Sequence, residues 1–189
     1  MRVGLLLLSG GDGRRMGAPK HALDHPEGGS WGGHLVQVFG TVFQGGPMLV
    51  LGDVLPDHPE LTRLEDPREG PAVALQTWAR TETPDVDRWW IVACDQVRWT
   101  SQRLAEWARI CEAEDPEAKH WVMALYGGHL QPLGGWLPNA LRPSLAASSA
   151  RSLMAMATSL PHLTVPCHGP EWADVDTQED RQAWELESH

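Results

Sequence analysis

The chain has 189 residues, a length typical of one domain, so we expect a single domain over 1–189. Its 42% hydrophobic content is enough to bury a core, which excludes a disordered or collagen-like chain. The formal net charge of −10 argues against binding to nucleic acid or to an anionic membrane surface, because both need a basic face.

The cysteines and the first apolar run indicate a cytoplasmic protein. Cys94, Cys111 and Cys167 lie far apart and form no CxxC or zinc-ligand spacing, so we expect buried thiols in a reducing compartment. The apolar run Val3–Leu8 is too short for a membrane span and, because glycines follow it at once, is also a poor signal peptide. We therefore expect a cytoplasmic enzyme or binding domain without a membrane or nucleic-acid partner.

Short apolar runs alternate with helical patterns along the chain. Continuous runs predict buried strands at Val3–Leu8, Pro47–Leu51, Trp89–Cys94 and Trp121–Tyr126, with a last strand around Leu163–Val165. Apolar spacing or caps predict helices over 35–43, 71–80, 104–111 (capped by Thr100 or Ser101) and 153–160, and a C-terminal helix that a Thr177–Asp180 capping box begins. The alternation favours a mostly parallel α/β sheet.

The glycine-rich segment, the tryptophans and the histidines are given structural rather than functional interpretations. The glycine-rich segment 25–33 is interpreted as a mobile surface loop. The ten tryptophans are interpreted as core and surface residues rather than a stacking platform. The nine histidines show no HxxxH or HExxH spacing, so the sequence assigns them no metal role.

The strongest signal for chemistry follows the first strand. Four glycines lie within residues 10–17, and Arg14, Arg15 and Lys20 accompany them. Glycines let backbone N–H groups approach phosphate oxygens, and the cations offset phosphate charge. Neither the GxGxxG fingerprint nor the Walker pattern matches. The alternative is an ordinary glycine-rich turn, which the three cations disfavour.

Three acidic segments lie near other element ends. Asp95 ends the third buried strand, at the sheet edge where parallel sheets bind ligands, so its carboxylate would lie near the cationic loop. A carboxylate facing such a loop is explained if Mg²⁺ binds between them. The segment 65–71 precedes a helix at the same edge, and in 172–180 one of the two alternating aspartates, Asp174 or Asp176, is a candidate second metal ligand. The structural alternatives are a turn cap at Asp95, a charged loop at 65–71 and helix-dipole compensation in 172–180.

Together these motifs resemble the molybdenum cofactor guanylyltransferases (the molybdopterin-guanine dinucleotide biosynthesis protein A family) of the nucleotidyltransferase superfamily. The family begins LAGGxxxRMGxxK, which is similar to Leu8-Ser9-Gly10-Gly11, Arg15-Met16-Gly17 and Lys20. Its acidic residue and GPLAGL resemble Asp66 and 70–75, and its PCDxP, QPL, RSL and NINTPEDL resemble 93–97, 131–133, 151–153 and 174–180. These matches fall in the same order from residue 5 to about 182.

The resemblance implies a three-layer α/β/α fold with a mostly parallel, Rossmann-like sheet of the nucleotide-diphospho-sugar transferase type. It implies Mg²⁺-dependent transfer of GMP from GTP to molybdopterin with release of pyrophosphate, and molybdenum cofactor insertion and acceptor proteins as partners. The implied catalytic residues are Arg15, Lys20 and Asp95. The implied nucleotide-binding residues are Leu8, Ser9, Gly10, Gly11, Gly13, Lys20, Asp66, Gly70, Pro71 and Asp95. Asp95 and Asp176 are the implied metal ligands, and Gln131 and Arg151 lie on the pterin side.

The chain departs from the family pattern at several positions, which leaves alternatives open. Ala74 replaces the last glycine of GPLAG, and Asp174 and Asp176 replace asparagines. The segment 17–20 (Gly-Ala-Pro-Lys) also resembles the sister cytidylyltransferases, whereas Gly10 and Gly11 favour guanine. A molybdenum cofactor cytidylyltransferase and a catalytically weak nucleotide-binding accessory module are therefore the alternative functions.

Overall fold

A computed structural model describes residues 1–10, 13 and 15–187 of the chain. The strands are β1 (Val3–Leu8), β2 (Met48–Leu51), β3 (Thr62–Leu64), β4 (Arg88–Ala93), β5 (Trp121–Tyr126), β6 (His129–Pro138) and β7 (His162–Pro166). The helices are α1 (Trp31–Val42), α2 (Pro71–Ala79), α3 (Ser101–Glu114), α4 (Arg142–Ala147), α5 (Leu153–Ser159) and α6 (Gln178–Glu187). Short 3-10 helices are η1 (Lys20–Ala22), η2 (Asn139–Leu141) and η3 (Pro170–Trp172).

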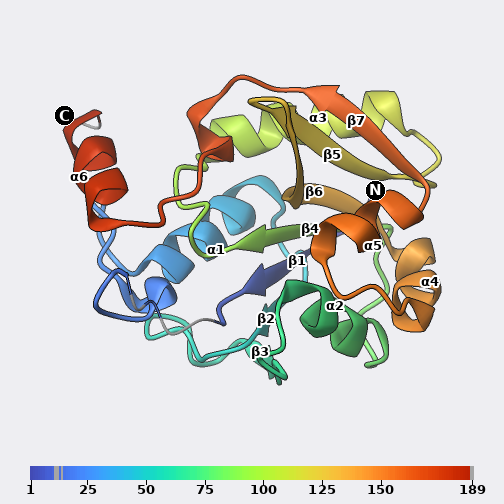
Figure 1. Ribbon diagram of the computed structural model, residues 1–189, viewed down its shortest axis with the longest axis horizontal. Helices are drawn as coiled ribbons and strands as arrows, with labels where there is room; N and C mark the ends of the chain where they lie inside the picture. The colour runs from blue at the N-terminus through green and yellow to red at the C-terminus, as the bar shows by residue number, and fades with distance from the viewer. Residues whose placement is uncertain (11–12, 14, 188–189) are drawn as a thin grey trace.

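The strands form one sheet in the order β3-β2-β1-β4-β6-β5-β7 (Figure 1). β1 pairs in parallel with β2 and β4, and β5 pairs in parallel with β7. Only β6 among the described strands runs against its neighbours, β4 and β5. The prediction of a mostly parallel α/β sheet is therefore confirmed, although β3, β6 and α4 were not predicted.

Helices cover both faces of the sheet, which gives three layers (Figure 1). Alternate side chains of β1 point to opposite faces, as strand geometry requires. Leu5 and Leu7 pack with residues of α1 and α3, whereas Leu6 and Leu8 pack with residues of α2, α4 and α5. Both faces of β1 are therefore core, which explains its uninterrupted apolar sequence.

A third, smaller cluster closes the carboxyl edge of the sheet. It joins Met16 and Leu23 of the segment after β1 to Trp31 of α1 and Trp184 of α6. The predicted capping box begins α6, since the Asp180 carboxylate accepts the Thr177 amide hydrogen bond at 2.8 Å and the Thr177 hydroxyl accepts that of Asp180 at 3.1 Å. The cluster and the cap together fix the C-terminal segment at the edge where β1 and β4 end.

Three expectations are corrected by the structure. The segment 25–33 is a surface loop only in part: residues 26–29 are exposed, but His25 is buried and α1 already begins at Trp31 with Ser30 as its N-cap. All ten tryptophans are buried, so none serves as a surface residue. The thiols of Cys94 and Cys111 are buried and free as expected, whereas Cys167 is half-buried.

Among the described residues, no helix has both the length and the apolar composition that crossing a membrane requires.

Candidate active site

A pocket of about 520 Å³ opens at the carboxyl ends of β1 and β4, beside the amino end of α2. Carboxyl ends of neighbouring parallel strands share one sheet edge, so residues far apart in sequence meet there. The lining residues are Leu8, Gly10, Gly13, Lys20, Asp66, Arg68, Gly70, Pro71, Ala74, Ala93, Cys94, Asp95 and Leu133. Eight of the residues that the sequence pointed to are in this lining: Leu8, Gly10, Gly13, Lys20, Asp66, Gly70, Pro71 and Asp95.

The segment after β1 packs closely against the segments that follow β2 and β3. Ser9 is fully buried, and its hydroxyl donates a hydrogen bond to the carbonyl of Asp53 at 2.7 Å. A Cβ on Gly10 would lie 2.2 Å from Oδ2 of Asp66, and one on Gly52 would lie 2.6 Å from the Gly10 nitrogen. Close approach of backbone therefore requires glycine at position 52, whereas a side chain at position 10 would displace the carboxylate of Asp66, which lies at the pocket wall.

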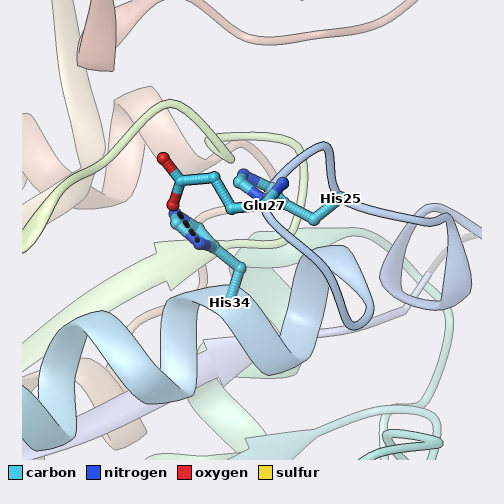
Figure 2. Close-up of side chains that lie close together, drawn as sticks. All are labelled: His25, Glu27 and His34. Carbon is cyan, nitrogen blue, oxygen red and sulfur yellow. Dashed lines mark hydrogen bonds and ion pairs between the residues drawn. The ribbon is translucent and has the colours of Figure 1, made fainter.

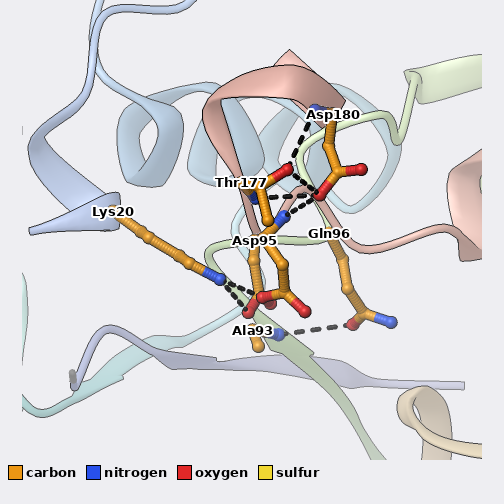
Figure 3. Close-up of polar contacts among 7 residues, drawn as sticks. Lys20, Ala93, Asp95, Gln96, Thr177 and Asp180 are labelled. Carbon is orange, nitrogen blue, oxygen red and sulfur yellow. Dashed lines mark hydrogen bonds and ion pairs between the residues drawn. The ribbon is translucent and has the colours of Figure 1, made fainter. Parts of the chain in front are cut away.

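Lys20 connects three parts of the chain at the pocket. Its ammonium lies 3.0 Å from the carboxylate of Asp95 and also contacts the carboxylate of Asp176 (Figure 3). Burial alone would lower the pKa of Lys20, but the two carboxylates outweigh burial and raise it above its ordinary value. Lys20 is therefore a fixed positive charge at the base of the pocket.

A third carboxylate makes this cluster electrostatically unbalanced. Desolvation of its carboxyl group raises the pKa of Asp174 to about 6 although the residue is exposed, with further contributions from the negative charges of Asp95 and Asp176. The Val175 amide donates to the Asp95 carbonyl at 3.0 Å, which holds the acidic segment against the end of β4. Three carboxylates face one ammonium, so the cluster attracts further positive charge.

The segment before α2 forms the opposite wall. Arg68 adopts a positive φ of 59°, its amide donates to Oδ1 of Asp66 at 2.8 Å, and its guanidinium lies 2.7 Å from Oδ1 of Asp53. Gly70, with φ of 95°, is the N-cap of α2 and has no side chain to occupy the helix end. The amino end of α2 therefore faces the pocket, where its partial positive charge favours an anion.

The remaining lining supports the end of β4. The side chain of Gln96 accepts a hydrogen bond from the Ala93 amide at 3.4 Å (Figure 3). It donates another to the Leu133 carbonyl at 3.2 Å, which ties the end of β4 to β6. Burial raises the pKa of Cys94, so its thiol stays protonated and is a poor nucleophile. Asp95 is thus held on a rigid strand end.

Some residues that the sequence pointed to do not line this pocket. Arg15 is exposed, and Gln131 is half-buried within β6. Arg151 is exposed and its guanidinium lies 3.8 Å from the Glu69 carboxylate, next to the pocket wall. Ser9 lies behind the lining and Asp176 beside Lys20. Gly11 and Arg14 fall outside the described residues.

Sequence reasoning placed Arg68 only as part of the charged segment 65–71, and it assigned no role to Asp53. Arg68 and Asp53 lie in polar segments, and the sequence around them does not predict the ion pair that they form. Their meeting depends on the parallel pairing of β2 with β3, and β3 has only three residues, too few for a periodic pattern.

The chain matches the MobA-like NTP transferase domain over residues 5–163. The chain belongs to this family. It is therefore a nucleotidyltransferase, and the suggested relationship to molybdenum cofactor guanylyltransferases is confirmed at the level of the family. No match is found among curated protein sequences.

Solved structures share the architecture at low sequence identity. Rv0371c from Mycobacterium tuberculosis H37Rv is 18% identical, with a TM-score of 0.71 over 98% of this chain and 99% of that chain. Molybdopterin-guanine dinucleotide biosynthesis protein A from Archaeoglobus fulgidus is 14% identical, with a TM-score of 0.71 over 98% of both chains. A manganese complex of Rv0371C is 15% identical, with a TM-score of 0.65 over 100% of both. These similarities confirm the predicted nucleotide-diphospho-sugar transferase type of fold.

Proposed function

We propose that this protein transfers GMP from GTP to the phosphate of molybdopterin and releases pyrophosphate. The observation that carries the proposal is the Lys20 ammonium between Asp95 and Asp176, at a pocket that a MobA-like domain builds from two strand ends and a helix amino end. Such a pocket combines fixed positive charge for a triphosphate with carboxylates for a metal.

The reaction needs positioning more than covalent chemistry from the protein. A phosphate oxygen of molybdopterin forms a bond to the α-phosphorus of GTP, and the bond to pyrophosphate breaks. The acceptor is already an anion, so no protein nucleophile is required. Lys20 and the amino end of α2 offset phosphate charge, and the close-packed backbone at Gly10 and the carboxylate of Asp66 provide partners for the base.

The acidic cluster fits a Mg²⁺ ion by its chemistry. Mg²⁺ prefers carboxylate oxygens together with substrate phosphates, and Asp95 and Asp176 offer such oxygens where negative charge exceeds the charge of Lys20. We propose Asp95 as the main ligand and Asp176 as the second. When bound, the ion would neutralise charge on the α-phosphoryl group and on pyrophosphate.

The acceptor side of the reaction is proposed from the resemblance. Gln131 and Arg151 would contact the pterin, and Arg151 is near the pocket through its ion pair with Glu69. Arg15 would assist catalysis from the segment after β1. Molybdenum cofactor insertion and acceptor proteins are the proposed partners, and the cytoplasm is the proposed location.

Calorimetric titration of the protein with GTP, CTP and ATP in the presence of Mg²⁺ tests the choice of nucleotide. A site that hydrogen-bonds the guanine edge rejects bases that leave its polar groups unpaired, so we expect GTP to bind most tightly. Equal or tighter binding of CTP would indicate a cytidylyltransferase. Addition of molybdopterin should then release pyrophosphate from GTP, whereas tight GTP binding without this release would indicate an accessory module.

A further inference from the structure

A second hollow of about 340 Å³ lies away from the nucleotide pocket, and among the described residues the two linings have none in common. The turn at 25–27, the first turns of α1, the segment 97–100 and Trp184 of α6 line it. Within it, the side chains of His25, Glu27 and His34 converge (Figure 2). Nothing in the proposed transfer reaction uses these three residues.

A tight turn places His25 and Glu27 opposite α1. Asp24 and Ser30 form a β-bridge across its base, and the His25 amide donates to the Gly29 carbonyl at 2.8 Å. Gly28 and Gly29 adopt positive φ values of 100° and 74°, which glycine tolerates without strain. The backbone therefore holds the two side chains of the turn against His34, in the first turns of α1.

The donor atoms of these residues form a compact group. One ligand atom from each residue lies within 4.8 Å of the other two, and Oε2 of Glu27 is 4.0 Å from Nδ1 of His34. The imidazole rings of His25 and His34 are stacked, with centroids 3.7 Å apart. Both rings are buried, whereas the Glu27 side chain is 78% exposed and able to swing toward them.

Backbone carbonyls hold the other side of both rings. Nε2 of His34 lies 2.8 Å from the Trp99 carbonyl oxygen, which fixes the proton there and leaves the lone pair on Nδ1, facing Glu27. The His25 ring hydrogen-bonds the backbone of Val97, and its Nδ1 accepts the Glu27 amide at 3.1 Å. Histidines that ligate metals characteristically donate their second nitrogen to a backbone carbonyl or a carboxylate in this way.

We propose that His25, Glu27 and His34 bind a divalent transition-metal ion of the Zn²⁺ class. Two imidazoles and one carboxylate are a ligand set that Zn²⁺ accepts, whereas Mg²⁺ prefers oxygen alone. Bonds of about 2.0–2.2 Å require the donor atoms to draw closer together. Lone pairs of stacked rings lie in parallel planes, so the two imidazoles must turn toward each other as the ion binds. The exposed Glu27 side chain then swings in, and the Glu27 backbone amide gives up its hydrogen bond to Nδ1 of His25. Three protein ligands leave a fourth position open to the hollow.

The bound ion would couple three segments of the molecule. Val97 and Trp99, whose backbones hold the two rings, follow Asp95 on the segment that leaves β4. Trp184 of α6 packs against the His25 ring, with centroids 5.2 Å apart. An ion at the histidines would therefore lock the turn, the segment after Asp95 and α6 together, as a structural metal does.

Binding of Zn²⁺ to the chelator-treated chain of 189 residues tests the proposal. Titration is followed by calorimetry in excess Mg²⁺, which occupies oxygen-only sites, and Co²⁺ is used in parallel for its visible absorption. We expect one Zn²⁺ per chain, a rise in Tm on its addition, and a Co²⁺ spectrum typical of four-coordinate nitrogen and oxygen ligation.

Matched variants locate the ion. We expect His34→Gln and Glu27→Gln each to weaken Zn²⁺ binding at least tenfold and to remove the rise in Tm. His58→Gln is the control, because His58 is 3.2 Å from Glu60 in an exposed pair outside the hollow, and it should leave binding unchanged. Glu27→Gln alters an exposed side chain, so it decides the matter if His34→Gln fails to fold. Absence of Zn²⁺ binding, or binding unchanged in both variants, would mean that the rings are only a packing element.

Discussion

The ammonium of Lys20 lies 3.0 Å from the carboxylate of Asp95, a residue 75 positions further along the chain. The same ammonium contacts Asp176, which is 156 positions away. One side chain thus links the segment after β1, the end of β4 and the segment before α6. Its loss should therefore change both ligand binding and the charge balance among three carboxylates.

Replacement of Lys20 by alanine should weaken GTP binding while leaving the fold intact. Lys20 lies in η1 outside the apolar clusters, so the core stays packed. Loss of a charge-assisted phosphate contact costs about 1.5–3 kcal/mol, roughly a tenfold to hundredfold rise in Kd, which calorimetric titration with GTP measures.

The control is Lys119→Ala, because Lys119 is the only other lysine of the sequence and pairs with Glu117 at the surface. It should bind GTP like the parent. Lys20→Arg should restore binding only in part, since the planar guanidinium differs from the ammonium in shape. GTP affinity unchanged in Lys20→Ala would remove Lys20 from the phosphate site.

A methyl group at position 10 should disturb the pocket through Asp66. Because a Cβ on Gly10 would lie 2.2 Å from Oδ2 of Asp66, that carboxylate must turn away and lose its contact with the Arg68 amide. We expect Gly10→Ala to raise the Kd for GTP about tenfold, the value of one hydrogen-bonded contact. Gly40→Ala is the control: its nearest neighbour is the flexible end of Met48 at 3.3 Å, so it should leave GTP binding unchanged. Equal GTP binding by both variants would argue against a role for Asp66.

The sequence predicts most of this site because its residues follow strand ends. The runs at 3–8 and 89–94 are apolar on both faces, which identifies buried parallel strands and places Gly10 and Asp95 at one edge. β6 was missed because it contains Pro132, Gly134 and Gly135, residues that interrupt a strand pattern.

Strand and helix patterns in the sequence do not predict contacts between side chains of different segments. His25 and His34 are nine residues apart, a spacing typical of no metal motif, and only the turn closed by Asp24 and Ser30 brings their rings together. The same limit applies to Asp174, since its raised pKa depends on the position of its carboxyl group near those of Asp95 and Asp176. The local sequence predicts neither the contact between the two histidine rings nor the raised pKa of Asp174.

The pKa of Asp174 predicts a pH-dependent stability. Its ordinary value is 3.8 and its value in the folded protein is about 6, so between these pH values the folded state holds more protons than the unfolded state. The free energy of unfolding therefore falls as the pH rises from about 4 to 6. Because the Asp174 residue is exposed, solvent screens its charge and the loss is smaller than the full pKa shift would give. Asp174→Asn cannot titrate and should escape this loss.

Thermal unfolding in metal-free buffer measures the difference. We expect Asp174→Asn to have a higher Tm than the parent at pH 7.5, and the gap to shrink toward pH 4. Asp85→Asn, a change at an exposed position of the loop before β4, should track the parent at every pH. A gap that is the same at all pH values would contradict the raised pKa.

Asp95→Asn should abolish most turnover and leave stability nearly unchanged. Asparagine keeps the size and capping ability of aspartate but loses the charge for Lys20 and for a metal. The lost ion pair and the relieved repulsion from Asp174 and Asp176 act in opposite directions, so we expect Tm to move by less than about 4 °C, the shift of about 1 kcal/mol in a domain of this size. Turnover, followed as pyrophosphate release from GTP with molybdopterin, should fall at least a hundredfold, about 2.7 kcal/mol of activation free energy. Asp85→Asn again serves as the control. If Asp95→Asn keeps both its Tm and its turnover, Asp95 merely caps the turn after β4, and the metal must bind elsewhere.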